Sequence, residues 1–473
     1  MTALQPILSS LLSPLLLKAA GLMPPFELPR WFLFLHHRLG VDLMDPVMQL
    51  AMLFVWAVVM FVLILVVAKA SVVFMVLMER KVLAWMTQRT GPNRVGPFGL
   101  LQTLADGVKL LFKEDVMTPA QDKVLFTLAP VIFILPVFVL YAFIPFTDFL
   151  YGLNMPVAAL GIFALSSISV IGMVLAGWGS NNKYSLIGGM RSAAQAISYE
   201  IPLVLSVLAV VLFTGSMNLM DIVTAQQGPL GLFSWNWFYI TPVAFFIFLV
   251  SSIAEVNRIP FDLPEAESEL VSGYNTEYSG MKFAMFFLAE YAALFVMSAL
   301  TVVFFFGGFN SPLTGIALGD VTIASTYIGT DFIASAGGGM ISVGQWLQQV
   351  VGLPKVEFLL TQMEMISWMV IKVYCLIFFA MWLRGTLPRL KPDQLMGFSW
   401  KFLMPLSLIN LFLVGVQKFW AYPNDSLEVL IQSITNNLGF LAFWLVLLVG
   451  GLGGFLWWIS RYYTRQWQAR FAK

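Results

Sequence analysis

The sequence predicts an all-α fold, a polytopic bundle of about nine transmembrane helices. Of its 473 residues, 59% are hydrophobic and only 11% are charged, whereas a soluble domain carries about 25% charged residues. So much apolar surface cannot be buried in one soluble core, and we expect many helices to cross a membrane. The formal net charge of +1 favours no acidic partner, so we expect no binding of nucleic acid.

Nine apolar runs have the length, about 20 residues, that a membrane-spanning helix needs. They lie near residues 50–78, 124–147, 154–179, 193–216, 237–257, 282–307, 362–383, 402–420 and 437–460. The linkers alternate between many and few Lys and Arg residues: the first, 79–123, holds seven, and the second, 148–153, holds none. The positive-inside rule then predicts an N-terminus outside and a C-terminus in the cytoplasm.

We expect three regions along the chain. Residues 1–49 form an N-terminal extension at the membrane interface, and residues 421–473 form an extra ninth span with a basic cytoplasmic tail. Between them, residues 50–420 form a core of eight spans. Four cytoplasmic loops belong to this core, at residues 79–123, 180–192, 258–282 and 384–401. It also has one long external insert, at residues 308–361.

The first cytoplasmic loop combines turns, cations and an amphipathic helix. Two Gly-Pro pairs force turns beside several basic residues. Apolar side chains then recur at helical spacing: Leu101, Leu104, Val108 and Leu111. The opposite face is polar and carries Gln102, Asp106, Lys109 and Lys113. This pattern predicts a short helix on the membrane surface or against a partner, and periodicity alone leaves a plain interfacial anchor as an equal alternative.

The third cytoplasmic loop is acidic. Between residues 255 and 277 one arginine, Arg258, opposes six carboxylates, which are Glu255, Asp262, Glu265, Glu267, Glu269 and Glu277. Crowded carboxylates in a partly desolvated place cannot all ionise, and some pKa values rise towards neutrality, which suits proton exchange. The alternative is a solvated acidic loop that docks a basic partner, and charge alone favours that alternative.

Four ionisable residues lie in or at the ends of apolar runs: Lys69, Glu200, Glu290 and Lys372. A charge at mid-bilayer costs roughly 3 kcal/mol on insertion scales, so such residues usually face a protein interior or a wet cavity. Glu200 precedes Pro202, which breaks the helical hydrogen-bond ladder and leaves room for water or a partner group. Each residue alone is compatible with a neutralised packing role, but four of them beside an acidic loop predict a polar path.

The sequence offers little for a metal or a bound cofactor. Cys375 is the single cysteine, which rules out an intramolecular disulfide and a cysteine metal cluster. His36 and His37 are adjacent and do not share a helix face. The glycine-rich stretches lie inside apolar runs and predict close helix packing rather than a phosphate-binding loop. We therefore expect no metal site in this chain, and any redox cofactor in other chains.

Together these residues resemble a known family, the quinone-channel membrane subunits, designated H, of the proton-pumping NADH:quinone oxidoreductases (respiratory complex I). The likeness covers roughly residues 50–420. It is carried by Glu79-Arg80-Lys81, the turn from Arg89 to Pro97, Ala105 to Lys109, Lys113 to Asp115, Ser198-Tyr199-Glu200, Ala254 to Glu269, Tyr274 to Glu277, Ala289-Glu290-Tyr291, Arg384 to Arg389 and Asp393 to Met396. The N-terminal extension, the long external insert and the ninth span depart from the family's eight-span core.

The resemblance implies a multi-pass protein of the bacterial inner (cytoplasmic) membrane, acting within an enzyme, a proton-translocating NADH:quinone oxidoreductase. Quinone, ubiquinone or menaquinone, would be a substrate and not a bound cofactor. The quinone tunnel and its mouth would be formed by Glu79, Arg80, Arg89, Arg94, Asp106, Lys109 and Arg258. A proton-coupling path would be formed by Glu200, Glu255, Asp262, Glu265, Glu267, Glu269, Glu277 and Glu290.

The resemblance also implies partners. They are the iron–sulfur and quinone-site subunits of a peripheral arm, the small and antiporter-like subunits of a membrane arm, and the lipid bilayer. FMN and iron–sulfur clusters would belong to those partner subunits. Three rival functions are a related subunit of membrane-bound hydrogenases, a free-standing secondary transporter and a structural anchor. The run from Arg89 to Arg94 favours the quinone-linked branch, and an anchor would not explain Glu200 and Glu290.

Overall fold

Long apolar runs become helices throughout the described part of the chain. The computed structural model describes residues 46–227, 231–239, 242–264, 270–312, 322–323, 341–342 and 356–421. Its α-helices are α3 (Pro46–Met86), α4 (Gln102–Phe112), α5 (Lys123–Tyr141), α6 (Ala158–Gly179), α7 (Lys183–Thr214), α8 (Leu219–Ala225), α9 (Asn236–Tyr239), α10 (Pro242–Glu255), α12 (Gly280–Phe305), α15 (Val356–Thr386), α16 (Pro392–Phe398) and α17 (Met404–Ala421).

Short elements complete the described structure. The 3₁₀ turns are Pro97–Gly99, Gly231–Ser234 and Gly273–Asn275, and a π-helix, Ser399–Leu403, joins α16 to α17. Among the described residues of the segment 308–361, β1 (Thr322–Ile323) pairs with β2 (Ile341–Ser342) in antiparallel fashion. These two-residue strands do not change the fold class, which is an all-helical bundle.

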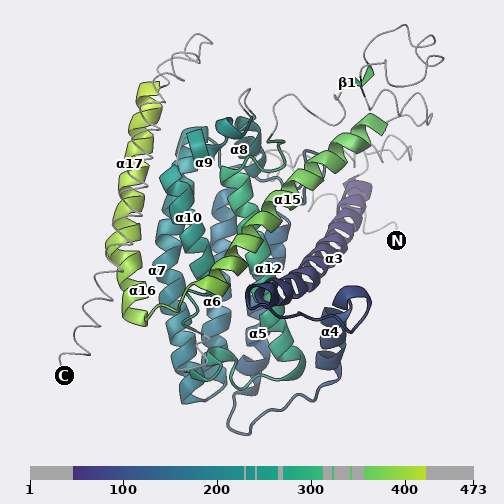
Figure 1. Ribbon diagram of the computed structural model, residues 1–473, viewed down its shortest axis with the longest axis vertical. Helices are drawn as coiled ribbons and strands as arrows, with labels where there is room; N and C mark the ends of the chain where they lie inside the picture. Colours follow the sequence, from purple (N-terminus) through teal and green to yellow (C-terminus); the bar gives the residue numbers. More distant parts are fainter. Residues whose placement is uncertain are drawn as a thin grey trace, which may run out of the picture.

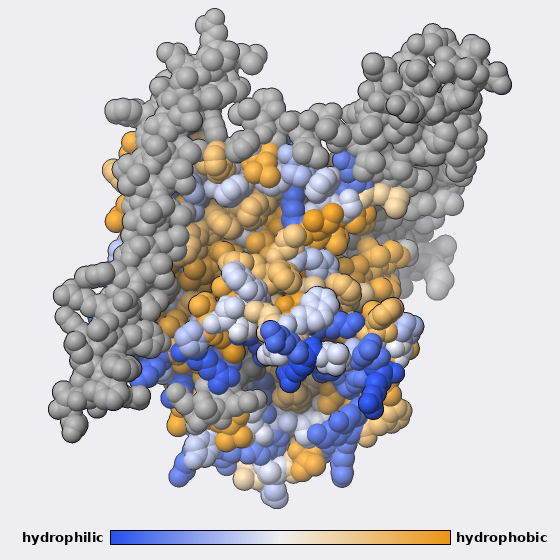
Figure 2. Space-filling model, in the orientation of Figure 1, coloured by the Kyte–Doolittle hydropathy of each residue, from blue (hydrophilic) through white to orange (hydrophobic). Residues whose placement is uncertain are grey.

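The helices are arranged as a bundle with slanting elements at its sides. In Figure 1, α5, α6, α7, α10 and α12 run close to the long axis, whereas α3 and α15 cross it at a slant and α17 stands at the opposite side. The amphipathic helix α4 lies at the lower end of the bundle, beside the end of α3. Figure 2 shows apolar side chains over the middle of this face and hydrophilic ones gathered towards the same lower end.

Seven described helices are long and apolar enough to cross a membrane. They coincide with seven of the predicted apolar runs and confirm the polytopic helical fold. The run at 237–257 differs, because its helix α10 has only 14 residues and is therefore about 21 Å long. The ninth predicted span, most of residues 1–49 with His36 and His37, and the carboxylates Glu265, Glu267 and Glu269 lie outside the described residues.

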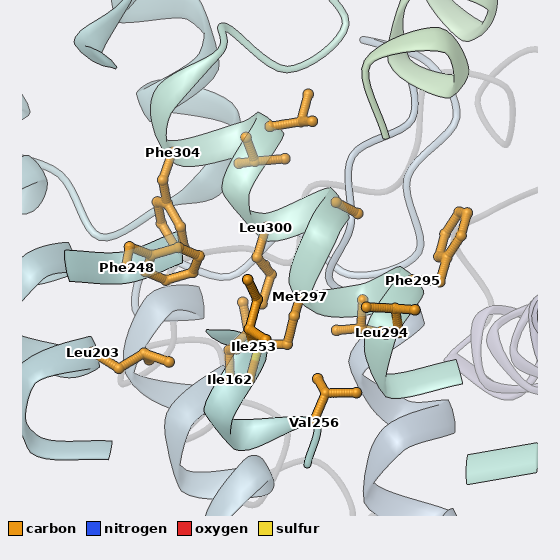
Figure 3. Packing of buried hydrophobic residues seen from close by; sticks show 14 of the residues in the cluster. Ile162, Leu203, Phe248, Ile253, Val256, Leu294, Phe295, Met297, Leu300 and Phe304 are labelled. Carbon is orange, nitrogen blue, oxygen red and sulfur yellow. The ribbon is translucent and has the colours of Figure 1, made fainter. Parts of the chain in front are cut away.

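The apolar core is centred on α12. In the most apolar stretch of this helix 83% of residues are buried, more than in any other spanning helix described. Figure 3 shows side chains of α6, α7, α10 and α12 packed together, with Phe248 against Phe304. The centroids of these two rings are 5.9 Å apart. Helix α12 therefore holds the surrounding helices in fixed positions, and it carries Glu290 into the bundle.

Helices α5 and α6 approach closely at Gly172. A Cβ on this residue would lie 2.8 Å from the backbone nitrogen and the Cβ of Phe133. Real Cβ atoms do not come this close to backbone atoms, so only glycine fits without a shift of one helix. Small residues at such crossings let two membrane helices make extensive van der Waals contact.

We predict that Gly172→Ala destabilises the protein by about 1–3 kcal/mol, the usual cost of overpacking a core. The measurement is the fraction of full-length protein that stays soluble in detergent after heating. Gly161→Ala is the matched control on the same helix, because the nearest atoms to its new Cβ are 3.6 Å away in the ring of Phe143. Equal midpoints for the two variants would contradict the packing argument.

Candidate functional site

A buried carboxylate, Glu79, is shared by two arginines. Glu79 lies near the end of α3 and is only 4% exposed. Its oxygens accept hydrogen bonds from Nη1 of Arg258 at 3.2 and 3.4 Å and from Nη1 of Arg384. The guanidinium of Arg258 also lies over the ring of Tyr291, 4.2 Å from its centroid. One carboxylate thus binds two guanidinium groups inside the protein.

A second ion pair joins the segment after α15 to the segment after α10. Nη2 of Arg389 donates to Oδ2 of Asp262 at 3.0 Å, and the backbone N–H of Leu390 donates to the carbonyl of Pro260 at 3.2 Å. The side chain of Asp262 is 10% exposed and that of Arg389 is 36% exposed. Together with the Glu79 cluster, these bonds join three segments that are far apart in the sequence.

The early end of α10 leaves non-helical backbone inside the protein. The carbonyl of Ala254 in the last turn and that of Phe261 just beyond both accept hydrogen bonds from Nε2 of Gln195, at 2.8 and 2.7 Å. Gln195 lies on α7 and is fully buried. Irregular backbone at membrane depth is tolerated only where protein or a wet cavity surrounds it. The third loop therefore begins within the bundle, not at its surface.

Glu255 and Glu290 line one small cavity. This cavity measures about 40 Å³ and has Ser166, Ser169 and Asn257 in its walls, among apolar side chains. Because a water molecule needs roughly 10–15 Å³ of such space and two or more polar partners, the cavity is large and polar enough for water. On its other side Glu290 accepts a hydrogen bond from the hydroxyl of Tyr274 at 2.7 Å.

Glu200 and Glu277 extend this group of carboxylates. Glu200 accepts a hydrogen bond from Oγ of Ser167 on α6, and it lies close enough to Glu255 for the two carboxyl groups to interact electrostatically. Glu277 accepts a hydrogen bond at 2.6 Å from Nδ2 of Asn182, the residue that caps α7. The carboxylates of α7, α10 and α12 thus lie near one another, and Glu277 is held at the start of α7.

The segment that carries Glu277 is fixed by aromatic residues. Tyr278 stacks on Phe126 with ring centroids 4.0 Å apart, and its hydroxyl donates to the carbonyl of Phe126 at 3.1 Å. Burial raises the pKa of the Tyr278 phenol above its usual value. The hydroxyl therefore remains a hydrogen-bond donor at neutral pH.

Most of the remaining predicted residues lie at the surface around α4. Arg80 pairs with Asp106 at 2.6 Å, and Nζ of Lys81 donates to the carbonyl of Phe98 at 2.6 Å. The loop between α3 and α4 exposes the side chains of Arg89 and Arg94, and the polar face of α4 exposes that of Lys109. The predicted amphipathic helix is confirmed as α4, and its apolar face is exposed too: Leu101, Leu104, Val108 and Leu111 are each 48–61% exposed.

The structure unites some predicted residues and separates others. It joins Glu79 to Arg258, and it gathers Glu200, Glu255 and Glu290 into one region. The two lysines singled out in the spans lie elsewhere: Lys69 is exposed on α3, and Nζ of Lys372 donates to three carbonyls, of Phe306, Gly308 and Asn310. Lys372 therefore caps the end of α12 and does not join the carboxylates.

Several polar residues of the site were not singled out as site residues from the sequence. They are Ser167, Gln195, Tyr274, Arg384 and Arg389, and a further buried carboxylate, Glu364, lies on α15. An arginine near a span end or a polar residue within an apolar run is the only signal that could have found them. Among the described residues no group of three or more His, Cys, Asp and Glu side chains could hold a metal ion.

A larger cavity lies apart from these charges. It measures about 370 Å³ and is lined mostly by apolar residues of α3, α15 and the segment that follows α5, and none of the carboxylates contributes to its lining. The polar atoms in its wall come from side chains such as Ser71, Tyr141 and Tyr374. The smaller cavity is the better candidate site, because of the two only the smaller one brings ionisable carboxyl groups to enclosed space.

Fold and site together define a class, a polytopic helical membrane protein with a buried network of ion pairs and carboxylates. A family model described as NADH dehydrogenase matches residues 57–415. Similar proteins are the NADH-quinone oxidoreductase H subunit of Brevibacillus brevis, 46% identical over 76% of this chain and 93% of that protein, and that of Dehalococcoides mccartyi, 41% identical over 76% of this chain and 86% of that protein. The chain belongs to this NADH dehydrogenase family, the family of the H subunits.

We predict that Glu79→Gln destabilises the protein by about 3 kcal/mol, because it removes the buried carboxylate that pairs with two guanidinium groups. Asp106→Asn is the control, since it breaks the more exposed Arg80 pair, whose side chains are 43% and 34% exposed and whose loss costs under about 1 kcal/mol. Thermal unfolding of the full-length protein in detergent measures both. A Glu79→Gln midpoint no lower than that of Asp106→Asn would refute the shared-carboxylate account.

Proposed function

We propose that this chain is the membrane subunit of a bacterial NADH:quinone oxidoreductase, in the inner membrane, that guides quinone to its reduction site and couples the reduction to proton translocation. The observation that carries the proposal is the cavity shared by Glu255 and Glu290, with Glu200 beside it. Ionisable groups buried at membrane depth are costly and usually mark an ion or proton path. The names of the related proteins, H subunits of NADH-quinone oxidoreductase, support the same function.

The quinone path in this proposal runs along α3 and α4. The apolar face of α4 is exposed beside the cationic end of α3, so it offers one wall of a passage for an isoprenoid chain, and partner subunits supply the other walls. The basic residues Arg80, Arg89, Arg94 and Lys109 surround the mouth of this passage. Behind it lie the two arginines that bind Glu79, Arg258 and Arg384, and a guanidinium group attracts a reduced, anionic headgroup.

The coupling step follows from electrostatics. Reduction of quinone to quinol adds two electrons and two protons, and electrons that arrive before protons leave negative charge on the headgroup. Nearby carboxylates then take up protons more readily, because a like charge disfavours their ionised form. In this proposal Asp262 and Glu277, with Glu265, Glu267 and Glu269, receive protons near the headgroup. Glu255, Glu200 and Glu290 pass the change in protonation into the membrane region.

The proposal requires partners. The electrons come from an iron–sulfur cluster in a peripheral-arm subunit, with FMN further upstream as the acceptor from NADH. Antiporter-like and small membrane subunits receive the change in protonation. The division into an interfacial N-terminal extension, a core at residues 50–420 and a ninth span at 421–473 is part of the same proposal, as is the orientation with the N-terminus outside.

We predict that Glu255→Gln and Glu290→Gln each lower proton translocation and quinone reductase activity of the assembled complex roughly tenfold or more, because acid–base groups contribute about 10²–10⁴-fold to such steps. Vesicles with a pH-sensitive dye measure translocation. Glu364→Gln is the control, a buried carboxylate that does not line the cavity. Wild-type translocation in both cavity variants would overturn the proposed function.

We also predict that Leu104→Gln with Leu111→Gln raises the KM for a long-chain quinone about tenfold, because lost apolar contact costs roughly 1–2 kcal/mol. A short-chain analogue should be affected less, and kcat should not change. The control is Leu408→Gln, which places the same polar group on the exposed face of α17. If the KM rises equally in the control, α4 has no special part in quinone access.

A further inference from the structure

The carbonyl of Ser198 lacks its usual helical partner. Helix α7 continues through Pro202, and proline has no backbone N–H to donate to the carbonyl four residues earlier. The hydroxyl of Ser399 fills this position, because Oγ of Ser399 donates to the Ser198 carbonyl at 2.6 Å. Ser399 is 1% exposed. The partner group expected at the proline break is therefore a side chain from a segment about 200 residues later in the chain.

Two further bonds join the same places. The hydroxyl of Tyr199 donates to the carbonyl of Leu395 at 2.9 Å, and Nε1 of Trp400 donates to Oγ of Ser198 at 3.2 Å. Ser198 and Tyr199 directly precede Glu200 in α7. Helix α16 and the start of the π-helix are thus hydrogen-bonded to the two residues next to a predicted proton-path carboxylate.

The other end of this segment reaches the ion pairs near the cytoplasmic surface. Arg384 binds Glu79 and Arg389 binds Asp262, and Ser399 follows Arg389 by ten positions in the chain. The chain between Arg389 and Ser399 consists of α16 and the short stretch before it. In that stretch the backbone N–H of Leu390 donates a hydrogen bond to the carbonyl of Pro260 in the third loop. One continuous segment therefore runs from the charged cluster to the proline break of α7.

The same device occurs once more in the described structure. Pro130 lies inside α5 and removes the usual donor from the carbonyl of Phe126. The hydroxyl of Tyr278 donates to that carbonyl at 3.1 Å, and Tyr278 directly follows Glu277. In both places a carbonyl freed by proline is bound by a hydroxyl, and a predicted proton-path carboxylate lies within two residues of one partner.

We infer that Ser399 is a positioning residue for Glu200, and that its bond to the proline-freed carbonyl transmits movement of the last cytoplasmic loop to that carboxylate. The inference rests on the proposed function. A quinone anion that arrives near Glu79 changes its ion pairs with the arginines. This change displaces Arg384 and the segment that runs from it to Ser399. Because the helical ladder is open at Pro202, α7 bends there more easily than elsewhere. The carboxyl group of Glu200 then moves relative to Ser167 and Glu255.

The test measures protons translocated per NADH oxidised, and the pH profile of quinone reduction, in the assembled complex. Ser399→Ala should lower the proton ratio roughly twofold or more, the scale of coupling changes along such networks, and should shift the pH profile. Ser399→Thr keeps the hydroxyl and should restore both. Ser407→Ala should leave both unchanged, because Ser407 is equally buried but donates to its own helix, at the carbonyl of Met404.

The double variant Pro202→Ala with Ser399→Ala distinguishes two roles of Ser399. One is to position Glu200, and the other is only to give the Ser198 carbonyl a hydrogen-bond donor. Pro202→Ala supplies a backbone N–H to the Ser198 carbonyl. We therefore expect the complex with the double variant to assemble even if the complex with Ser399→Ala alone assembles poorly. We expect the proton ratio of the double variant to stay low, because the link to α16 is still missing. A wild-type ratio and pH profile in the double variant, or in Ser399→Ala, would overturn the inference.

Glu200→Gln distinguishes failure of the inferred positioning role of Ser399 from failure of the proposed function. If Glu200→Gln lowers the proton ratio while Ser399→Ala does not, only the positioning role is wrong. If Glu200→Gln, Glu255→Gln and Glu290→Gln all translocate protons normally, the proposed function itself fails, and the positioning role fails with it.

Discussion

A single carboxylate held between two guanidinium groups joins the end of α3 to two later segments of this protein. Glu79 is buried on α3, and its partners Arg258 and Arg384 come from two other segments. An unpaired charge in this place would be strongly unfavourable, whereas each pairing contributes only if the geometry is good. The three segments are therefore fixed to one another by the need to pair a buried charge, and in the proposed function the two arginines lie where a reduced quinone would arrive.

Helix α10 ends inside the protein. Its last residue is Glu255, and the chain continues through the bundle without helical structure. Gln195 binds two carbonyls of this stretch. The result is enclosed space next to Glu255 and Glu290 within a bundle whose other contacts are largely apolar.

The helical fold and the amphipathic helix α4 could be predicted from the sequence, because apolar periodicity is a local signal. Misplaced charges are local signals too, and they singled out the carboxylates, whose role stays a prediction. The sequence did not predict which charges pair. The partners Glu79 and Arg384 are 305 residues apart, and no local pattern encodes such a distance. Gln195 and Ser399 were missed for the same reason: their importance comes from carbonyls on other helices. The Pro202 break was visible in the sequence, whereas the identity of the group that fills it required the structure.

The account as a whole depends on buried carboxylates that gain and lose protons when quinone is reduced. The most direct measurement is infrared difference spectroscopy of the assembled complex between its quinone and quinol states, in the absorption region of protonated carboxyl groups. The account predicts a reversible band there that disappears in Glu255→Gln. A spectrum without any carboxyl band, or one identical in the wild type and the variant, would contradict it.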